Sequence, residues 1–220
     1  VDPLTPARAA STRLSFSAAV ARLTVAAEHI GGYQRALFGG WIDADGDGFN
    51  TRAEVLMSES KVAVTWNARH TILTGRWYSL YDAATWSKAS DVDIDHVVPL
   101  AEAWDSGASA WSSSTREAFA NDLGDARSLI AVTARSNRQK SDQDPAEWLP
   151  ARGRCTYLVS WIAVKVRWQL NIDSAETIKA DVQFGTSATT ACVGNDSRLS
   201  DARTPIAHAT SHKSGGGDAI

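Results

Sequence analysis

The chain has few of the features that would assign it to a membrane or to a strongly basic nucleic-acid-binding class. No apolar run in its 220 residues approaches the length that spans a bilayer, so we expect no membrane partner. The formal net charge is −3, which taken alone argues against a nucleic-acid partner. The chain begins with Val1, and we expect any signal peptide to have been removed already.

Cysteine is also scarce. The two cysteines, Cys155 and Cys192, leave room for at most one disulfide. In an extracellular protein such a pair is usually bridged, and a loop of this size would gain roughly 3–4 kcal/mol in the chain-entropy model. The alternative is two buried free thiols in a cytosolic protein.

Core-forming residues, in contrast, are abundant. Hydrophobic residues make up 44 % of the chain and nine residues are Trp, which is enough for a substantial core. This length fits one domain, or one domain with an appendage. Residues 194–220 are polar, rich in Gly and poor in core-forming residues. We therefore place a domain at 1–193 and a flexible tail or linker at 194–220.

The apolar spacing predicts helices around a small strand pair, which is class α+β. Ser114, followed by Glu117, is a candidate N-cap with a capping box. The helices are expected over 12–30, 54–66, 134–141, 157–170 and 174–183, and extended structure over 71–81 and 128–133.

The most informative stretch is Asp-Ile-Asp-His-Val-Val-Pro at residues 93–99, followed at a distance by Asn137. Carboxylate and amide oxygens are hard ligands that suit Mg²⁺ or Mn²⁺, and the His96 imidazole can take a proton from water near neutral pH. Neighbouring side chains on a strand point to opposite faces, so Asp95 and His96 can share one site only where the strand ends or bends. Pro99 is a candidate for that bend. The pattern favours a one-metal nuclease site.

The spacing beyond this pair is more specific. Ser128-Leu129 stands nine residues before Asn137, and Lys140 stands three residues after it. Together with the segments DIDHVVPLAEAW, FANDL and NRQKSDQDPAEWLP, this resembles the HNH (ββα-metal) endonuclease family in its secreted actinobacterial type, over about residues 20–192. The resemblance implies a ββα-metal hairpin and helix within residues 91–150, surrounded by additional helices.

The resemblance also implies roles for these residues. His96 would be the general base, Asp95 and Asn137 would hold a catalytic Mg²⁺ or Mn²⁺, and Lys140 would follow the ligand on its helix as part of the catalytic group. The family's middle Asn, which orients the base, falls here on Ser128. Either Ser128 does this work weakly, or Asn121 of the FANDL run replaces it. The expected reaction is hydrolysis of phosphodiester bonds in DNA, with RNA as the alternative, and it leaves a 5′-phosphate.

A second metal loop is predicted from residues 43–54, which fill the twelve-position calcium-loop pattern. Arg52 lies within this loop and could face substrate. The alternative is an acidic turn without metal. The expected calcium ligands are Asp43, Asp45, Asp47, the Phe49 carbonyl and Glu54.

Positive charge is concentrated between Arg127 and Trp168, where eight basic and three acidic residues give a local charge of +5. A phosphodiester substrate needs such a patch, and we expect Arg127, Arg135 and Arg138 to contact it. The alternative is an ordinary solvated helix face.

The resemblance extends to the cysteines and the tail. Relatives of the HNH type carry a Cys near Cys155 and near Cys192, and a second pair where this chain has Phe49 and near His70. Residues 194–220 resemble a segment of phage tail-fibre and other virion proteins. The expected location is therefore extracellular, or associated with a virion as part of a phage particle.

Two further functions stay open from the sequence. One is a catalytically weak or inactive nuclease-fold module of a phage virion or cell-surface protein, which serves binding or structure. The other is a calcium-stabilised secreted domain without a nucleic-acid role, which the +5 segment argues against.

Overall fold

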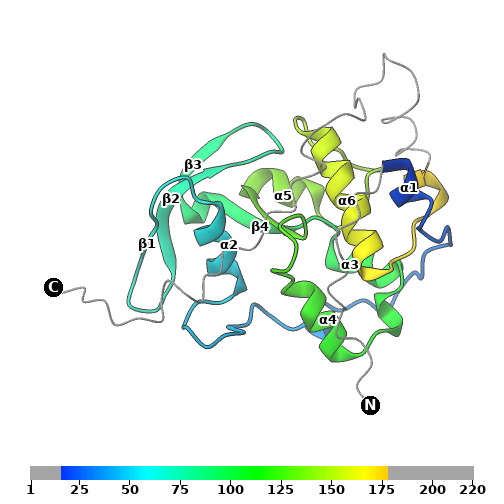
Figure 1. The fold of residues 1–220 in the computed structure, drawn as a ribbon, viewed down its shortest axis with the longest axis horizontal. Helices are drawn as coiled ribbons and strands as arrows, with labels where there is room; N and C mark the ends of the chain where they lie inside the picture. Colours follow the sequence, from blue (N-terminus) through cyan, green and yellow to red (C-terminus); the bar gives the residue numbers. More distant parts are fainter. Residues whose placement is uncertain (1–15, 178–220) are drawn as a thin grey trace.

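The structure is a computed structural model that describes residues 16–177, and over these residues it is mixed α+β, with several helices and two small sheets (Figure 1). None of the described helices is long and apolar enough to cross a membrane. In chain order the elements are α1 (Phe16–Val20), η1 (Arg35–Phe38), α2 (Thr51–Glu59), β1 (Thr65–Trp66), β2 (Ile72–Tyr78), β3 (Thr85–Lys88), η2 (Ala89–Asp91), β4 (Val92–His96), α3 (Leu100–Asp105), η3 (Ala108–Ala110), α4 (Ser113–Ala120), β5 (Leu129–Thr133), α5 (Ala134–Lys140) and α6 (Arg154–Trp168).

Strands β4 and β5 form an antiparallel pair near the middle of the molecule (Figure 1). His96, the last residue of β4, faces Leu129, the first residue of β5. β5 continues directly into α5, because Thr133 ends the strand and Ala134 begins the helix. The strand and helix predicted over 128–133 and 134–141 correspond to β5 and α5. The end of β4 and the last turn of α5 are thereby brought together.

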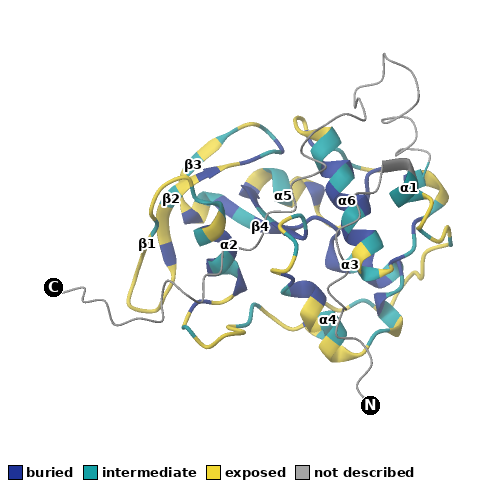
Figure 2. Cartoon of the chain, viewed as in Figure 1, coloured by how far each residue is buried: buried dark blue, intermediate teal, exposed yellow. Residues whose placement is uncertain are grey.

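Two hydrophobic clusters hold this unit from opposite sides (Figure 2). One cluster gathers buried residues of α3, α4 and α6, among them the nearly fully buried Trp161. The other lies between α2, β2 and the β4–β5 pair, where Leu56, Trp77 and Ile94 are buried. The three-stranded sheet, in the order β1-β2-β3, packs against this second cluster through β2.

The helix predicted over 12–30 is wrong beyond Val20. From Val20 the chain continues without helix, and Val25 bridges Ile172 in parallel. The amide of Ala26 donates to the Ile172 carbonyl at 3.0 Å, so long-range backbone bonds replace those of a helix. Local apolar spacing could not reveal that competition.

Smaller differences concern helix ends. α2 begins at Thr51, earlier than predicted, because the Asn50 side chain accepts from the Ala53 amide at 3.1 Å and caps the helix. It ends at Glu59, and the predicted continuation to residue 66 is wrong, since Thr65–Trp66 form strand β1. The N-cap of α4 is Ser112 and not Ser114. α6 corresponds to the helix predicted over 157–170, but it begins at Arg154 and ends at Trp168, where Gln169 is a left-handed C-cap. The helix predicted over 174–183 and the tail at 194–220 fall mostly or wholly outside the described residues.

The HNH type carries a second pair of cysteines at the position of Phe49 and near His70, and in this structure Phe49 and His70 are neighbours. The Phe49 ring stacks on the His70 ring, with centroids 4.5 Å apart. A disulfide joining these two places in relatives is compatible with this contact. Cys155, on α6, is not a free thiol. Cys192 lies outside the described residues, so its pairing with Cys155 stays a prediction.

Candidate active site

Asp95 is buried at the end of β4 and is held by two donors. Lys140 Nζ lies 2.8 Å from Oδ1 and 2.9 Å from Oδ2, and the Tyr81 hydroxyl donates to Oδ2. Lys140 Nζ also donates to the His96 carbonyl at 2.8 Å. Burial raises the pKa of the Asp95 carboxyl, and the Lys140 charge opposes that rise. Lys140, with none of its side chain exposed, therefore fastens α5 to the end of β4.

His96 is fixed by a different set of contacts. Its Nε2 lies 2.9 Å from the carbonyl oxygen of Ala120. A carbonyl only accepts, so Nε2 carries the hydrogen and Nδ1 of the neutral ring carries the lone pair. Burial lowers the pKa of His96 to about 4, so the ring is neutral at physiological pH. Nδ1 makes no hydrogen bond within residues 16–177. It is also not one of the polar atoms that these residues bury completely without a partner, so a water molecule can reach it.

Ser128 and Asn121 are the two candidates for orienting the base, and neither side chain forms a hydrogen bond with His96. The Ser128 hydroxyl donates to Asp122 Oδ2 at 2.8 Å, and Asp122 is also paired with Arg167. The Asn121 amide bonds to the segment that precedes α2, accepting from the Ile42 amide at 3.1 Å. The backbone carbonyl that holds the ring belongs to Ala120, next to Asn121.

The predicted metal partner of Asp95 lies on α5. Asn137 is half-buried, three residues before Lys140 on the same helix. Its side chain makes no hydrogen bond with the described residues, so its amide oxygen is available as a ligand. Joint binding of a cation by Asp95 and Asn137 stays a prediction.

The four predicted substrate-contacting arginines differ in how far their charge is already used. Arg52 Nη2 donates to the Ala89 and Val92 carbonyls at 3.0 Å each, which ties α2 to β4. Arg127 forms a two-point pair with Asp125, with Nη2 2.6 Å from Oδ2. Arg135 and Arg138 are exposed on α5, although Arg138 Nε lies 3.3 Å from Asp93 Oδ2 in a solvent-exposed ion pair. The two exposed arginines are the stronger candidates for binding phosphate.

The acidic loop before α2 turns back on its own aspartates, and its binding of calcium stays a prediction. The Gly46 and Gly48 amides donate to the two Asp43 carboxylate oxygens at 2.9 Å, and Gly46 takes a φ of 75°. Oxygens of Asp43, Asp45 and Asp47 lie within 4.8 Å of one another. Burial, followed by the charges of Asp47, Asp45 and Asp43, raises the pKa of Glu54 to about 7.

Comparison with known proteins identifies the family of this chain. The family model of the GmrSD restriction endonucleases, C-terminal domain, matches residues 52–179. The chain belongs to this family. An uncharacterized secreted protein of Arthroderma benhamiae is 48 % identical over 148 residues, which cover 66 % of this chain and 71 % of that protein. No solved structure matches the chain.

The GmrSD match includes Asp95, His96, Ser128, Asn137 and Lys140, and it begins within α2. The aspartates of the acidic loop lie before it. Neither comparison supports the actinobacterial type or the phage tail, so those two resemblances stay predictions.

Three residues near His96 and Asp95 were missed from the sequence. Tyr81 donates to Asp95, Trp41 stacks on His96 with centroids 5.1 Å apart, and the charge of exposed Arg35 contributes to the lowered pKa of His96. All three lie before β4 in the chain, outside the motif segments. Only the tertiary fold brings them to the site, so no local signal could have identified them.

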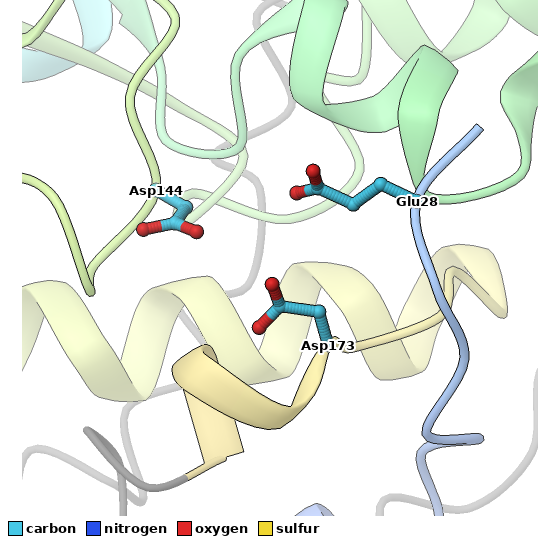
Figure 3. A group of neighbouring side chains, drawn as sticks. All are labelled: Glu28, Asp144 and Asp173. Carbon is cyan, nitrogen blue, oxygen red and sulfur yellow. The ribbon is translucent and has the colours of Figure 1, made fainter. Parts of the chain in front are cut away.

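The structure also brings together three carboxylates that no motif indicates. Glu28, Asp144 and Asp173 come from three separate segments and point toward one another (Figure 3). Burial raises the pKa of Glu28 and Asp144, and neighbouring carboxylates add to the rise. Asp144 Oδ1 accepts from the Ala146 and Glu147 amides, and Asp173 Oδ1 from the Glu176 amide. Two of the three thus already act in backbone turns, and we assign the group no function.

Proposed function

We propose that this protein is a metal-dependent endonuclease that hydrolyses phosphodiester bonds of DNA. The observation that carries the proposal is the state of His96 at the end of β4. The ring is neutral and held through Nε2–H on the Ala120 carbonyl, and its Nδ1 has no hydrogen-bond partner among residues 16–177. Membership of a restriction endonuclease domain family supports the same chemistry. In this proposal β4, β5 and α5 form the ββα-metal core.

The donor set suits one hard cation, Mg²⁺ or Mn²⁺. A carboxylate has about four lone-pair directions, and Lys140 and Tyr81 take up three of those of Asp95. The remaining direction, with the Asn137 amide oxygen and water, would hold the ion. When bound, the ion would supply positive charge for a non-bridging phosphate oxygen and the leaving 3′ oxygen.

The residues of the chain would then act as follows. His96 Nδ1 takes a proton from a water molecule while the water oxygen forms a bond to phosphorus and the bond to the 3′ oxygen breaks. The product carries a 5′-phosphate. Lys140 holds the backbone at His96 and the Asp95 carboxylate in place, so we regard it as a positioning residue. Arg135 and Arg138 would bind flanking phosphates.

The acidic loop would bind Ca²⁺ as a structural ion, through Asp43, Asp45, Asp47, the Phe49 carbonyl and Glu54. The folded loop supports this, because its backbone amides already orient the aspartates. We also propose that the protein is secreted, as its relative from Arthroderma benhamiae is described to be.

A plasmid assay tests the proposed function. Supercoiled DNA is incubated with the protein and Mg²⁺, with Mn²⁺, or with EDTA, and the products are resolved on a gel. We expect nicked and linear DNA with either ion, and loss of both with EDTA. Uncleaved plasmid with both ions would refute the proposal.

A further inference from the structure

The imidazole of His96 stacks with two aromatic rings. The Trp41 ring is parallel to it, at an interplanar angle of 2° and a centroid distance of 5.1 Å. The Phe119 ring lies at 6.5 Å and 18°. The bond from Nε2 to the Ala120 carbonyl restrains rotation of the ring about Cβ–Cγ. The stack and the bond together fix the plane of the imidazole and the direction of its Nδ1 lone pair.

Trp41 is itself held in place by Asn121. The Asn121 Oδ1 accepts from the Ile42 amide at 3.1 Å and from the Thr51 hydroxyl at 2.7 Å. Its Nδ2 donates to the Gly40 carbonyl at 3.1 Å and to the Glu117 carbonyl at 2.9 Å. Both neighbours of Trp41 are therefore bound by one amide, which uses all of its hydrogen-bonding capacity.

The Asn121 amide also connects the Trp41 segment to α4, whose last residue, Ala120, holds His96. Asn121 follows Ala120 directly, and its bond to the Glu117 carbonyl fastens it to the end of α4. A displacement of the Trp41 segment would thus be transmitted to both contacts of the imidazole, the ring face and the Ala120 carbonyl.

We propose that Trp41 and Asn121 are positioning residues for the base: Trp41 fixes the plane of the His96 ring, and Asn121 fixes Trp41. The inference rests on the proposed function, since it assigns a purpose to the orientation of His96. It also accounts for the departure at position 128, because Ser128 is engaged by Asp122 and leaves the orientation of the base to other residues.

The test compares Trp41→Met, which removes the ring but keeps an apolar side chain, with Trp41→Phe, which keeps a ring face. Asn121→Ser removes the hydrogen bonds of the amide to Gly40 and Ile42 and leaves the side chain of His96 unchanged. Trp66→Met is the control, because Trp66 is an exposed tryptophan on β1 without ring contact to His96. kcat and KM for cleavage of a DNA duplex are measured with Mg²⁺, together with Tm and the NMR shift of the His96 Cε1 proton, assigned by its absence in His96→Ala.

Misplacement of a reacting group by about 1 Å can reduce the rate by about 100-fold. We expect kcat to fall about 10- to 100-fold in Trp41→Met and Asn121→Ser with KM nearly unchanged, and to recover to within about threefold of wild type in Trp41→Phe. Trp66→Met should behave as wild type. The Cε1 proton, shifted upfield by the Trp41 ring, should move downfield in Trp41→Met but not in Trp66→Met.

Two failures are distinguishable. No cleavage by the wild-type protein would refute the proposed function and this inference with it. Cleavage by wild type with an unchanged kcat in folded Trp41→Met or Asn121→Ser would overturn this inference alone. If Trp41→Met does not fold, a kcat in Trp41→Phe as low as that of Asn121→Ser would equally overturn it, because Phe retains the stacking face.

Discussion

At the level of single residues, Lys140 and Asp95 form an ion pair with almost no exposed surface. Both charges are desolvated, and each is satisfied only because the other is present, together with Tyr81 and the His96 carbonyl. Lys140 Nζ also donates to the backbone carbonyl of the proposed base, His96, at 2.8 Å. The integrity of the ion pair therefore determines where the backbone of His96 lies.

Removal of one member should be much more harmful than removal of both. Lys140→Met leaves the Asp95 charge buried and unpaired, which should lower the free energy of unfolding by about 3–5 kcal/mol. The double variant Lys140→Met/Asp95→Asn should recover part of this loss. Urea unfolding of the two single variants and the double variant measures the coupling. If the losses of unfolding free energy in the two single variants add up to the loss in the double variant, Lys140 and Asp95 do not stabilise each other.

A second buried lysine gives a prediction about pH. Lys165 Nζ pairs with Glu176 at 2.8 Å and with Glu102 at 2.7 Å. Burial, opposed by Lys165, raises the pKa of Glu176 from 4.5 to about 7. The native state thus holds this proton more tightly than the unfolded chain. The stabilisation is fully present below about pH 4.5 and is lost as the pH rises through about 7.

Glu176→Gln tests this directly, because Gln keeps an acceptor for Lys165 and cannot titrate. The wild-type protein should lose up to about 3 kcal/mol from this group between about pH 4.5 and pH 8, and the variant should lack that part of the slope. Free energies of unfolding from urea titrations at several pH values give the comparison. Parallel pH profiles for the two proteins would contradict the assignment.

At the level of elements, the acidic loop and α2 form one unit. Asn50 caps the helix, Gly46 and Gly48 turn the loop, and the Thr51 amide donates to the Ile42 carbonyl at 2.8 Å. A bound Ca²⁺ should stabilise the folded state in proportion to the logarithm of its concentration, by about 2.7 kcal/mol at 100 times Kd. We expect Ca²⁺ to raise Tm in the wild-type protein and to have no such effect in Asp43→Asn.

Asp142→Asn is the matched control, since Asp142 is an exposed carboxylate outside the loop. It should keep the full rise in Tm. If Asp43→Asn responds to Ca²⁺ as strongly as the control does, the loop is an acidic turn without a specific ion.

The elements also show what the sequence could predict. β5 and α5 follow from a short apolar run, a polar helix-like run and the fixed spacing between Ser128 and Asn137. The partners of Asp95 and His96 could not be derived in the same way. Tyr81 and Trp41 reach the site through the packing of distant segments, and the bond to Ala120 is made by a backbone carbonyl, which carries no side-chain signature.

At the level of the whole molecule, the positive segment from Arg127 to Trp168 is less exposed than its composition suggests. Lys140 and Lys165 are buried, and Arg127 and Arg167 are paired with acids. Burial and ion pairing depend on the fold, so a count along the sequence overestimates the charge that a substrate would meet. Arg135 and Arg138 on α5 are among the residues left exposed, and the pair that Arg138 makes with Asp93 is open to solvent.

Substituting both arginines by Ala should raise KM several-fold with little change in kcat. The slope of the logarithm of the DNA-binding constant against the logarithm of the salt concentration should fall in magnitude by about 1 to 2, because two phosphate contacts are lost. Arg22→Ala, an exposed arginine in the segment after α1, should leave both quantities unchanged. An unchanged KM in the double variant would place the substrate on another surface.

The most direct test of the whole account is cleavage by His96→Ala. Rates of plasmid cleavage under single-turnover conditions with Mg²⁺ are compared with wild type, and Tm confirms that the variant folds. Loss of the base should reduce the rate by about 10²- to 10⁴-fold while the protein stays folded. Cleavage at the wild-type rate by folded His96→Ala would contradict the assignment of His96 as the general base.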